Sequence, residues 1–272
     1  MATYYLDFSS SLDGANDGSY GNPWASFSEV GTNQVLAEGD VVSIVNGGSV
    51  AGQTINNSTS GIIYRGLGVS RTELDFGTST IDASNNANSV FVEGISFKTG
   101  NASNVFDGNL NFTGTFTFKE SKIVSTATSQ QTQGVRSSTS GVFVFNSCSL
   151  SFPLGFSAAF TNQGWAILDQ CTLNLGPTAT YAAGVGGYYN TINNSFVYSE
   201  SVIQFTGGVI PIPMNNSYHS SSITPSGSGN TDYGSNPLLA DKDNNNLLFL
   251  PTNPIITSTS ATGTNIPSDA IW

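Results

Sequence analysis

The sequence predicts an all-β solenoid, in which short strands wind into stacked coils. Three observations favour this fold class. A phrase of alternating apolar and polar residues, such as Phe143-Val144-Phe145-Asn146-Ser147-Cys148, recurs at intervals of 23 to 27 residues. Only 9% of the residues are charged while 11% are aromatic, whereas a disordered chain usually combines low hydrophobicity with high charge. Abundant Ser, Thr and Asn suit flat strand ladders, where stacked like charges would repel each other.

The recurring phrase has its first polar break at equivalent positions of five repeats. These positions are Glu93, Lys119, Asn146, Asp169 and Asn193. Small or polar residues follow the breaks, at corners where the backbone often needs a positive φ. Each coil then turns apolar side chains such as Phe143 and Phe145 inward, and burying one of them contributes roughly 1.5–3 kcal/mol. Because one coil cannot cover its own apolar face, stacking of the coils provides the cooperativity.

We expect a single domain with three regions. Residues 1–40 form an N-terminal cap, residues 41–224 form about seven coils, and residues 225–272 form an extended C-terminal tail. Within the cap, residues 22–30 predict one short helix, since Asn22 can cap it and Pro23 suits its first turn. Trp24, Phe27 and Val30 would fall on one face of that helix. The helix would then cover the open end of the first coil.

The two cysteines, Cys148 and Cys171, hold the same place in successive repeats. Ser121 precedes them and Ser195 follows them at the equivalent position, so we expect an inward column of small, buried side chains. Equivalent residues on adjacent coils lie ~4.8 Å apart. Both buried free thiols and a disulfide fit that separation, so the redox state stays open. Two thiols alone are too few for a metal site.

Charge narrows the classes of partner. The formal net charge is −11, with only seven Lys and Arg residues, which disfavours nucleic acids and anionic membrane surfaces. No apolar run is long enough to span a bilayer. Residues 1–8 have neither the basic nor the apolar region of a secretory signal. We therefore expect a protein made in a host cytoplasm that leaves the cell as part of a virion.

Both ends of the chain resemble a known family. Tyr4-Tyr5-Leu6-Asp7, the loop at 13–18, Asn22-Pro23-Trp24 and Gly39-Asp40-Val41-Val42 are similar to the N-terminal signature of the pectate-lyase-like superfamily, in its phage virion-associated type. Residues 236–255 resemble the C-terminal motif of that family, although residues 256–258 replace its usual Asp-Ala-Gly turn. The resemblance implies a right-handed parallel β-helix. This fold hosts lyases, hydrolases, adhesins and phage structural proteins alike, so it does not specify an activity.

Lyases of this superfamily use a Lys or Arg base beside carboxylates that bind Ca²⁺, so the resemblance implies a set of candidate catalytic residues. The set is Lys119, Lys122, Glu120 and Asp169. The base would remove a proton from the sugar, and the cation would stabilise the resulting negative charge. The sequence shows no dense acidic group on adjacent coils, which favours solvated ladder positions for these side chains. A glycosidase pair at Asp75 and Asp82 and a triad around His219 are weaker hypotheses of the same kind.

A loop with Asp13, Asn16 and Asp17 resembles a calcium site in composition. Its residues lack the ligand spacing of an EF-hand, and an Asn/Asp/Gly turn also explains them. We expect no cofactor, with Ca²⁺ at this loop as the alternative.

Two uncharged segments are candidates for contact with partners. The first contains Val209, Ile210, Ile212 and Met214, and its prolines exclude a regular central strand. The second is Ile271-Trp272, whose aromatic ring is suited to anchoring in a pocket of this chain or of a neighbour.

The leading functional hypothesis is a non-enzymatic virion structural protein, either a capsid decoration protein or an adhesin. Its partners would be capsid or tail proteins, with a host surface glycan as a further ligand, and family analogy suggests a homotrimer. The alternatives are a polysaccharide lyase or depolymerase acting on a surface glycan, and a bacterial surface adhesin.

Overall fold

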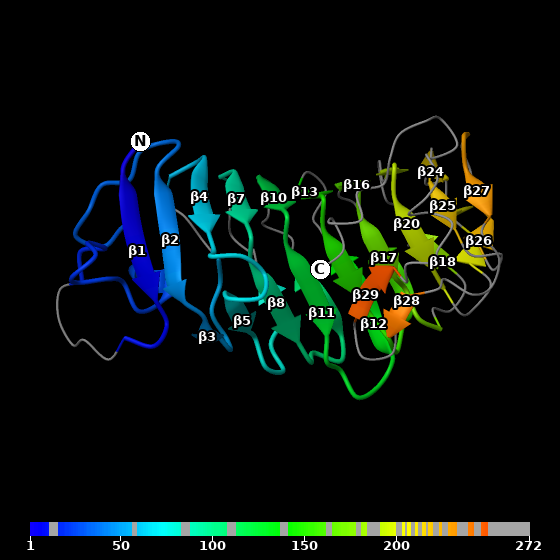
Figure 1. The fold of residues 1–272 in the computed structure, drawn as a ribbon, viewed down its shortest axis with the longest axis horizontal. Helices are drawn as coiled ribbons and strands as arrows, with labels where there is room; N and C mark the ends of the chain where they lie inside the picture. The colour runs from blue at the N-terminus through cyan, green and yellow to red at the C-terminus, as the bar shows by residue number, and fades with distance from the viewer. Residues whose placement is uncertain are drawn as a thin grey trace.

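The computed structural model describes residues 1–10, 16–55, 59–82, 88–107, 113–136, 141–161, 165–177, 181–183, 191–199, 203–204, 206–207, 210–211, 214–215, 217–219, 223–224, 228–232, 239–241 and 246–249. Within these residues the chain is a parallel β-solenoid, which confirms the predicted fold class. The coils stack into a rod with the N-terminal strand β1 at one end and β27 at the other (Figure 1).

Three parallel sheets run along the rod, and from β4 onward the successive coils contribute one strand to each sheet, up to β26. The first sheet contains β1 (Thr3–Asp7), β2 (Val41–Asn46), β4 (Ile62–Arg65), β7 (Val90–Glu93), β10 (Thr115–Lys119), β13 (Val142–Asn146), β16 (Trp165–Asp169), β19 (Thr191–Asn193) and β24 (Met214–Asn215). The second sheet contains β3 (Gly48–Ser49), β5 (Glu73–Asp75), β8 (Ser96–Thr99), β11 (Lys122–Ser125), β14 (Ser149–Ser151), β17 (Thr172–Asn174), β20 (Phe196–Tyr198), β25 (Tyr218–His219) and β27 (Thr231–Asp232). The third sheet contains β6 (Ile81–Asp82), β9 (Asn104–Asp107), β12 (Gln131–Arg136), β15 (Phe156–Thr161), β18 (Tyr181–Ala183), β21 (Ile203–Gln204) and β26 (Ile223–Thr224).

Two antiparallel pairs lie outside these three sheets. They are β22 (Thr206–Gly207) with β23 (Ile210–Pro211), and β28 (Leu239–Asp241) with β29 (Asn246–Phe249).

The core consists of aromatic side chains that stack from coil to coil. Phe116 and Phe118 on β10 pair in register with Phe143 and Phe145 on β13, and all four side chains are fully buried. The rings of Phe118 and Phe145 stack with centroids 5.0 Å apart, and Phe106 packs edge-on against both. Stacked and edge-to-face aromatic pairs each stabilise a core beyond the area that they bury. The inward positions are therefore those that the recurring phrase predicts.

At five successive coils a left-handed residue joins a strand of the first sheet to the next strand of the second sheet. Gly94 adopts this conformation between β7 and β8, and Glu120, Ser147, Gln170 and Asn194 adopt it at the equivalent corners, with φ between 49° and 68°. The single left-handed residue turns the chain sharply, so that residues on either side of it belong to different sheets. The polar break of the repeat is therefore a corner of the solenoid.

The predicted column of small inward residues is confirmed. Ser121, Cys148, Cys171 and Ser195 follow the left-handed corners, and each is fully buried. Both cysteines are free thiols. Burial raises the pKa of the Cys171 thiol well above its ordinary value, which keeps the sulfur protonated and unreactive.

The predicted N-terminal helix is wrong. The segment holds one turn of 3₁₀ helix, η1 (Phe27–Glu29), and Trp24 is extended. The Trp24 N–H donates to the Tyr5 carbonyl at 3.0 Å, and the Trp24 carbonyl accepts from the Asp7 N–H at 2.8 Å. Pairing with β1 therefore satisfies the Trp24 backbone in an extended conformation that a helix would exclude. The Trp24 side chain is still fully buried, and its ring stacks on Tyr4.

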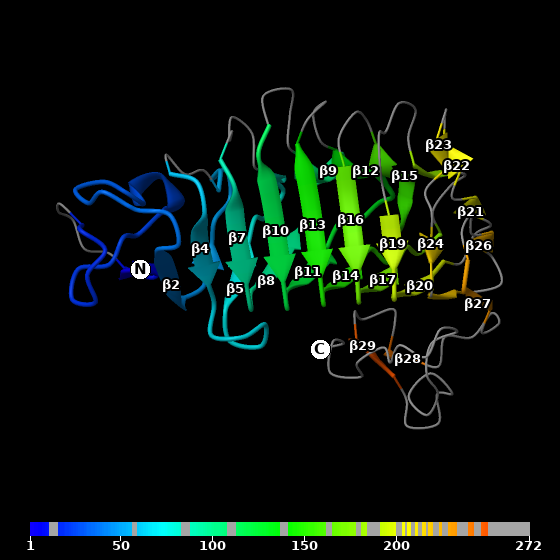
Figure 2. The ribbon, with the colours of Figure 1, turned by 90° about the horizontal axis from the view of Figure 1, so that it is seen from above.

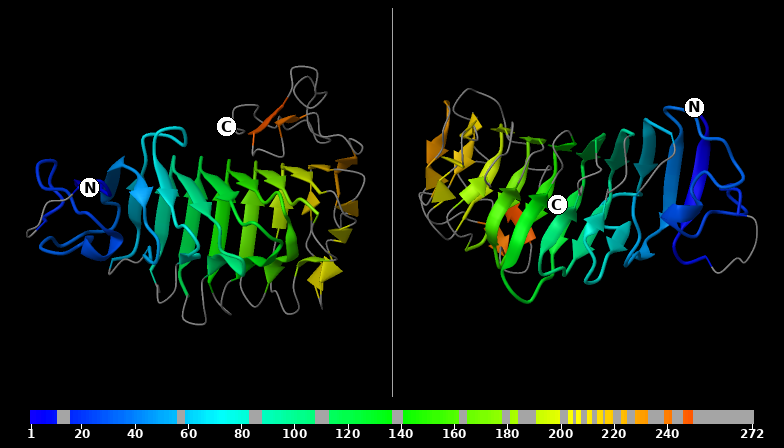
Figure 3. Two further views of the ribbon diagram at one scale, coloured as in Figure 1. Left: turned by 90° about the horizontal axis from the view of Figure 1, so that it is seen from below. Right: turned by 180° about the vertical axis from the view of Figure 1, so that it is seen from behind.

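The second sheet is covered on its outer side. All residues of β14, β17 and β20 are buried, although alternate side chains of a strand point to opposite faces. The antiparallel pair β28–β29 lies along the outer side of these strands in two perpendicular views (Figures 1 and 2), and the view from below shows the same arrangement (Figure 3). The pair forms its own two-stranded sheet, so within the described residues it shares no backbone ladder with the solenoid.

Candidate functional site

Five polar side chains form a row at the corner between the first and second sheets. This polar row consists of Arg65, Glu93, Lys119, Asn146 and Asp169, which pair in register on β4, β7, β10, β13 and β16. Each residue ends its strand immediately before the corner. Two of the four catalytic candidates, Lys119 and Asp169, thus share one column with Asn146 between them, as the repeat predicts.

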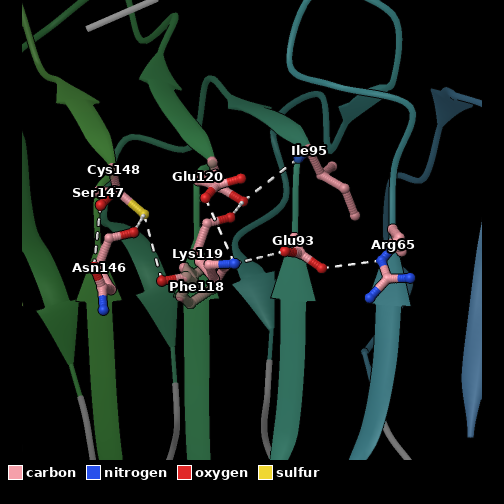
Figure 4. A network of polar contacts seen from close by, with 10 residues as sticks. Arg65, Glu93, Ile95, Phe118, Lys119, Glu120, Asn146, Ser147 and Cys148 are labelled. Atoms are coloured by element: carbon pink, nitrogen blue, oxygen red, sulfur yellow. Dashed lines mark hydrogen bonds and ion pairs between the residues drawn. The ribbon is translucent and has the colours of Figure 1, made fainter. Parts of the chain in front are cut away.

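Lys119 is the centre of an ion-pair network (Figure 4). Its Nζ lies 2.8 Å from Glu93 Oε1 and 3.5 Å from Glu120 Oε1. The other oxygen of Glu93 accepts a hydrogen bond from Arg65 Nε at 3.0 Å. The hydrogen bond with Glu93 and the charges of both glutamates raise the pKa of Lys119, and the Lys119 hydrogen bond lowers the pKa of Glu93. Both groups are therefore held in their charged forms, and neither is suited to proton transfer near neutral pH.

Hydrogen bonds among polar side chains continue this network along the rod. Ser147 Oγ donates to Asn146 Oδ1 at 3.1 Å, and it lies 3.2 Å from Gln170 Oε1. Asp169 Oδ1 accepts from Asn194 Nδ2 at 2.8 Å. Each of these contacts joins residues of the polar row or its left-handed corners. The carboxylate of Asp169 is thus engaged by a neighbour on the next coil.

Lys122 is separated from Lys119 and Asp169 by the corner at Glu120. It lies on β11 in the second sheet, where it pairs with Ser96 and Ser149. Burial lowers the pKa of Lys122, and the nearby charge of Lys98 lowers it further. Lys98 itself forms an ion pair with Glu73 at 2.8 Å. The four lyase candidates therefore do not converge on one point.

The N-terminal loop does not gather its predicted calcium ligands within the described residues. Asn16 is buried, and its Nδ2 donates to Glu29 Oε2 at 2.9 Å. The Asp17 carboxylate accepts from the Ser19 N–H at 2.9 Å, in the manner of a polar turn. Asp13 lies outside the described residues. The part of the chain that the structure describes holds no group of three or more His, Cys, Asp or Glu side chains placed to bind a metal.

The weaker catalytic hypotheses concern residues on different elements. Asp75 belongs to β5 of the second sheet, and Asp82 belongs to β6 of the third. Asp75 Oδ1 accepts from the Gly77 N–H, and Asp82 Oδ2 accepts from Thr54 Oγ1. His219 lies on β25 near the far end of the rod.

The partner-binding candidates lie mostly beyond the described residues. Ile210 belongs to β23 and Met214 to β24, while Val209, Ile212, Ile271 and Trp272 lie outside the described ranges. No helix among the described residues has the length and apolar character that crossing a membrane requires.

Sequence reasoning missed an apolar column on the outer face of the first sheet. Ile63, Phe91, Thr117, Val144 and Ile167 pair in register, and all five side chains are partly accessible. The alternation within the recurring phrase contains the signal, because the residue two places before each polar break must share its face.

No protein-family model and no curated protein matches the chain. A solved structure of a rhamnogalacturonan lyase is similar, with 14% sequence identity and a TM-score of 0.46 over 82% of this chain and 74% of that chain. At this level of similarity the comparison carries no argument about the fold or the activity of this chain.

Proposed function

We propose that the protein is a non-enzymatic structural component of a phage particle, exposed as a capsid decoration protein or adhesin. The observation that supports the proposal best is the state of Lys119. This lysine is bound by Glu93 and Glu120 and is held protonated. The polar row therefore joins neighbouring coils, and its residues are not arranged as a base and an acid.

The solenoid also suits a role as a spacer or support. Its core is continuous from Trp24 near one end to Val197 near the other. Adjacent coils share parallel strand ladders and stacked side chains, so each coil supports its neighbours. A rod of this kind presents surface residues at fixed intervals, which is useful on a particle that meets a host surface.

Particle fractionation tests the proposal. Purified particles are separated by density, and the protein is quantified by mass spectrometry in every fraction. We expect it to sediment with the major capsid protein at a constant molar ratio. Recovery only in the fractions of soluble proteins, with none in the particle band, would reject the proposal.

One observation favours a second candidate, a polysaccharide lyase. Lys122 is half-buried, and burial lowers its pKa, which is the direction that a lysine general base requires. Turnover of an acidic polysaccharide by the wild-type protein, abolished in Lys122→Met but retained in Lys98→Met, would establish this function in place of the structural role.

A further inference from the structure

The apolar column is an uncharged strip on a strongly anionic protein. Phe91 on β7 is 41% exposed. Ile63 precedes it on β4, and Thr117, Val144 and Ile167 follow it on β10, β13 and β16. No described element covers this face of the first sheet (Figure 2). Exposed apolar surface of this kind marks a site of association.

The polar row borders the apolar column on the same face. Each of its residues lies two places after the corresponding apolar residue, so both side chains point outward from one strand. From β4 to β16 the row reads positive, negative, positive, neutral and negative. When a second copy of the row is laid against the first in the opposite order, about the midpoint between Glu93 and Lys119, each Glu93 meets a Lys119 and no two like charges meet.

The net charge indicates which partner fits. Two copies of this chain each carry a net charge of −11 and repel each other over most of their surfaces. The face of the first sheet reduces that repulsion, because its centre is uncharged and its border contains Arg65 and Lys119.

We propose that two copies of the chain pack these faces together, with their rods antiparallel and a two-fold axis between β7 and β10. The axis places Glu93 opposite Lys119 of the partner subunit, and Arg65 opposite Asn146 of the partner subunit. Asp169 then faces Ser43 of the partner subunit, so no like charges meet. The apolar columns lie against each other, as the isologous symmetry of a dimer requires.

The size of the face sets the strength of the contact. The six strands β2, β4, β7, β10, β13 and β16, spaced ~4.8 Å apart and four to six residues long, give a face of roughly 400–500 Å² per copy. Stable complexes bury about 800 Å² per partner. The dimer is therefore weak and depends on concentration. This inference goes beyond the proposed particle role and does not depend on it.

Sedimentation equilibrium of the full chain over a range of concentrations tests the proposal. We expect wild type to dimerise, and Phe91→Glu to weaken dimerisation at least tenfold. Leu154→Glu is the control, since Leu154 is also 41% exposed but lies on a turn away from this face. It should dimerise like wild type.

A pair of charge reversals tests the geometry. Glu93→Lys and Lys119→Glu should each be monomeric, because each places like charges across the axis. An equimolar mixture of the two variants should form heterodimers, because opposite charges then meet at both positions. Misfolding cannot produce this rescue. A monomeric wild type at all concentrations, or a mixture that stays monomeric while wild type dimerises, would overturn the proposal.

Discussion

Ser195 accepts a hydrogen bond from the backbone N–H of Cys171 on the preceding coil, at 3.1 Å. The same hydroxyl donates to the Asn193 carbonyl at 2.6 Å. The inward column of serines and cysteines thus joins one coil to the next through its side chains as well as through the strand ladders.

Ser195→Ala should destabilise the protein, because it leaves the buried Cys171 N–H and Asn193 carbonyl without these contacts. The expected loss is about 1–3 kcal/mol in the free energy of unfolding. Ser195→Cys should lose less, since a thiol occupies the equivalent position at residues 148 and 171. Urea denaturation of both variants checks this, and a Ser195→Ala variant as stable as wild type would show that the hydrogen bonds of the column contribute nothing.

Phe145→Asp should prevent folding, whereas Thr117→Asp should be tolerated. Phe145 is fully buried between Phe118 and Phe106, and an unpaired carboxylate there adds its desolvation cost to a cavity cost of about 3–5 kcal/mol. Thr117 points outward from the first sheet, where substitutions usually change stability by about 0.5 kcal/mol or less. Thermal melts at low protein concentration measure the contrast, and indistinguishable melts would refute the assigned register.

Removing the hydroxyls of Ser149 and Thr172 should stabilise the protein. Both hydroxyl oxygens are buried without a hydrogen-bond partner, on strands β14 and β17 of the second sheet. Ser149→Ala and Thr172→Val should each raise the free energy of unfolding by about 1 kcal/mol, since an unsatisfied buried hydroxyl is costly. Ser125→Ala is the control, because Ser125 Oγ accepts the Ala127 N–H and its loss should destabilise. Destabilisation by all three would mean that the two hydroxyls find partners.

Lys122→Met should raise the melting temperature near neutral pH and have less effect in alkaline solution. Burial lowers the pKa of Lys122 in the folded protein. The protonated lysine therefore opposes folding at every pH below the folded pKa. This penalty disappears as the pH rises from the folded pKa to the unfolded value of about 10.4. Thermal melts of wild type and of Lys122→Met from pH 7 to pH 11 measure how the difference in melting temperature changes with pH. A difference that grows as the pH rises would contradict the prediction.

The register of the coils could be predicted from the sequence because each coil repeats the same local pattern. Cys148 and Cys171 occupy equivalent places in that pattern, so their shared column follows from the repeat alone. The conformation of Trp24 does not follow from such a pattern. Its helical spacing is a local signal, and the pairing with Leu6 across the chain prevails over it.

The positions of the candidate site residues within the repeat could be predicted from the sequence, but the sheet to which each belongs could not. Lys119 and Asp169 share a column because both end equivalent strands. Lys122 appears beside Lys119 in the sequence, but the left-handed Glu120 turns the chain between them onto another sheet. The burial of Ser149 and Thr172 could not be predicted, because both side chains alternate with the inward residues of the repeat and would be expected on the outer face.

The central claim is that the polar row supports the solenoid and performs no chemistry. The most direct test follows the viscosity of polygalacturonate and hyaluronate solutions with wild-type protein and with Lys119→Met. We expect neither protein to lower the viscosity faster than buffer. We also expect Lys119→Met to lose no more than about 1 kcal/mol of stability, as for an exposed ion pair. Depolymerisation by wild type that Lys119→Met abolishes, with an unchanged melting temperature, would contradict the claim.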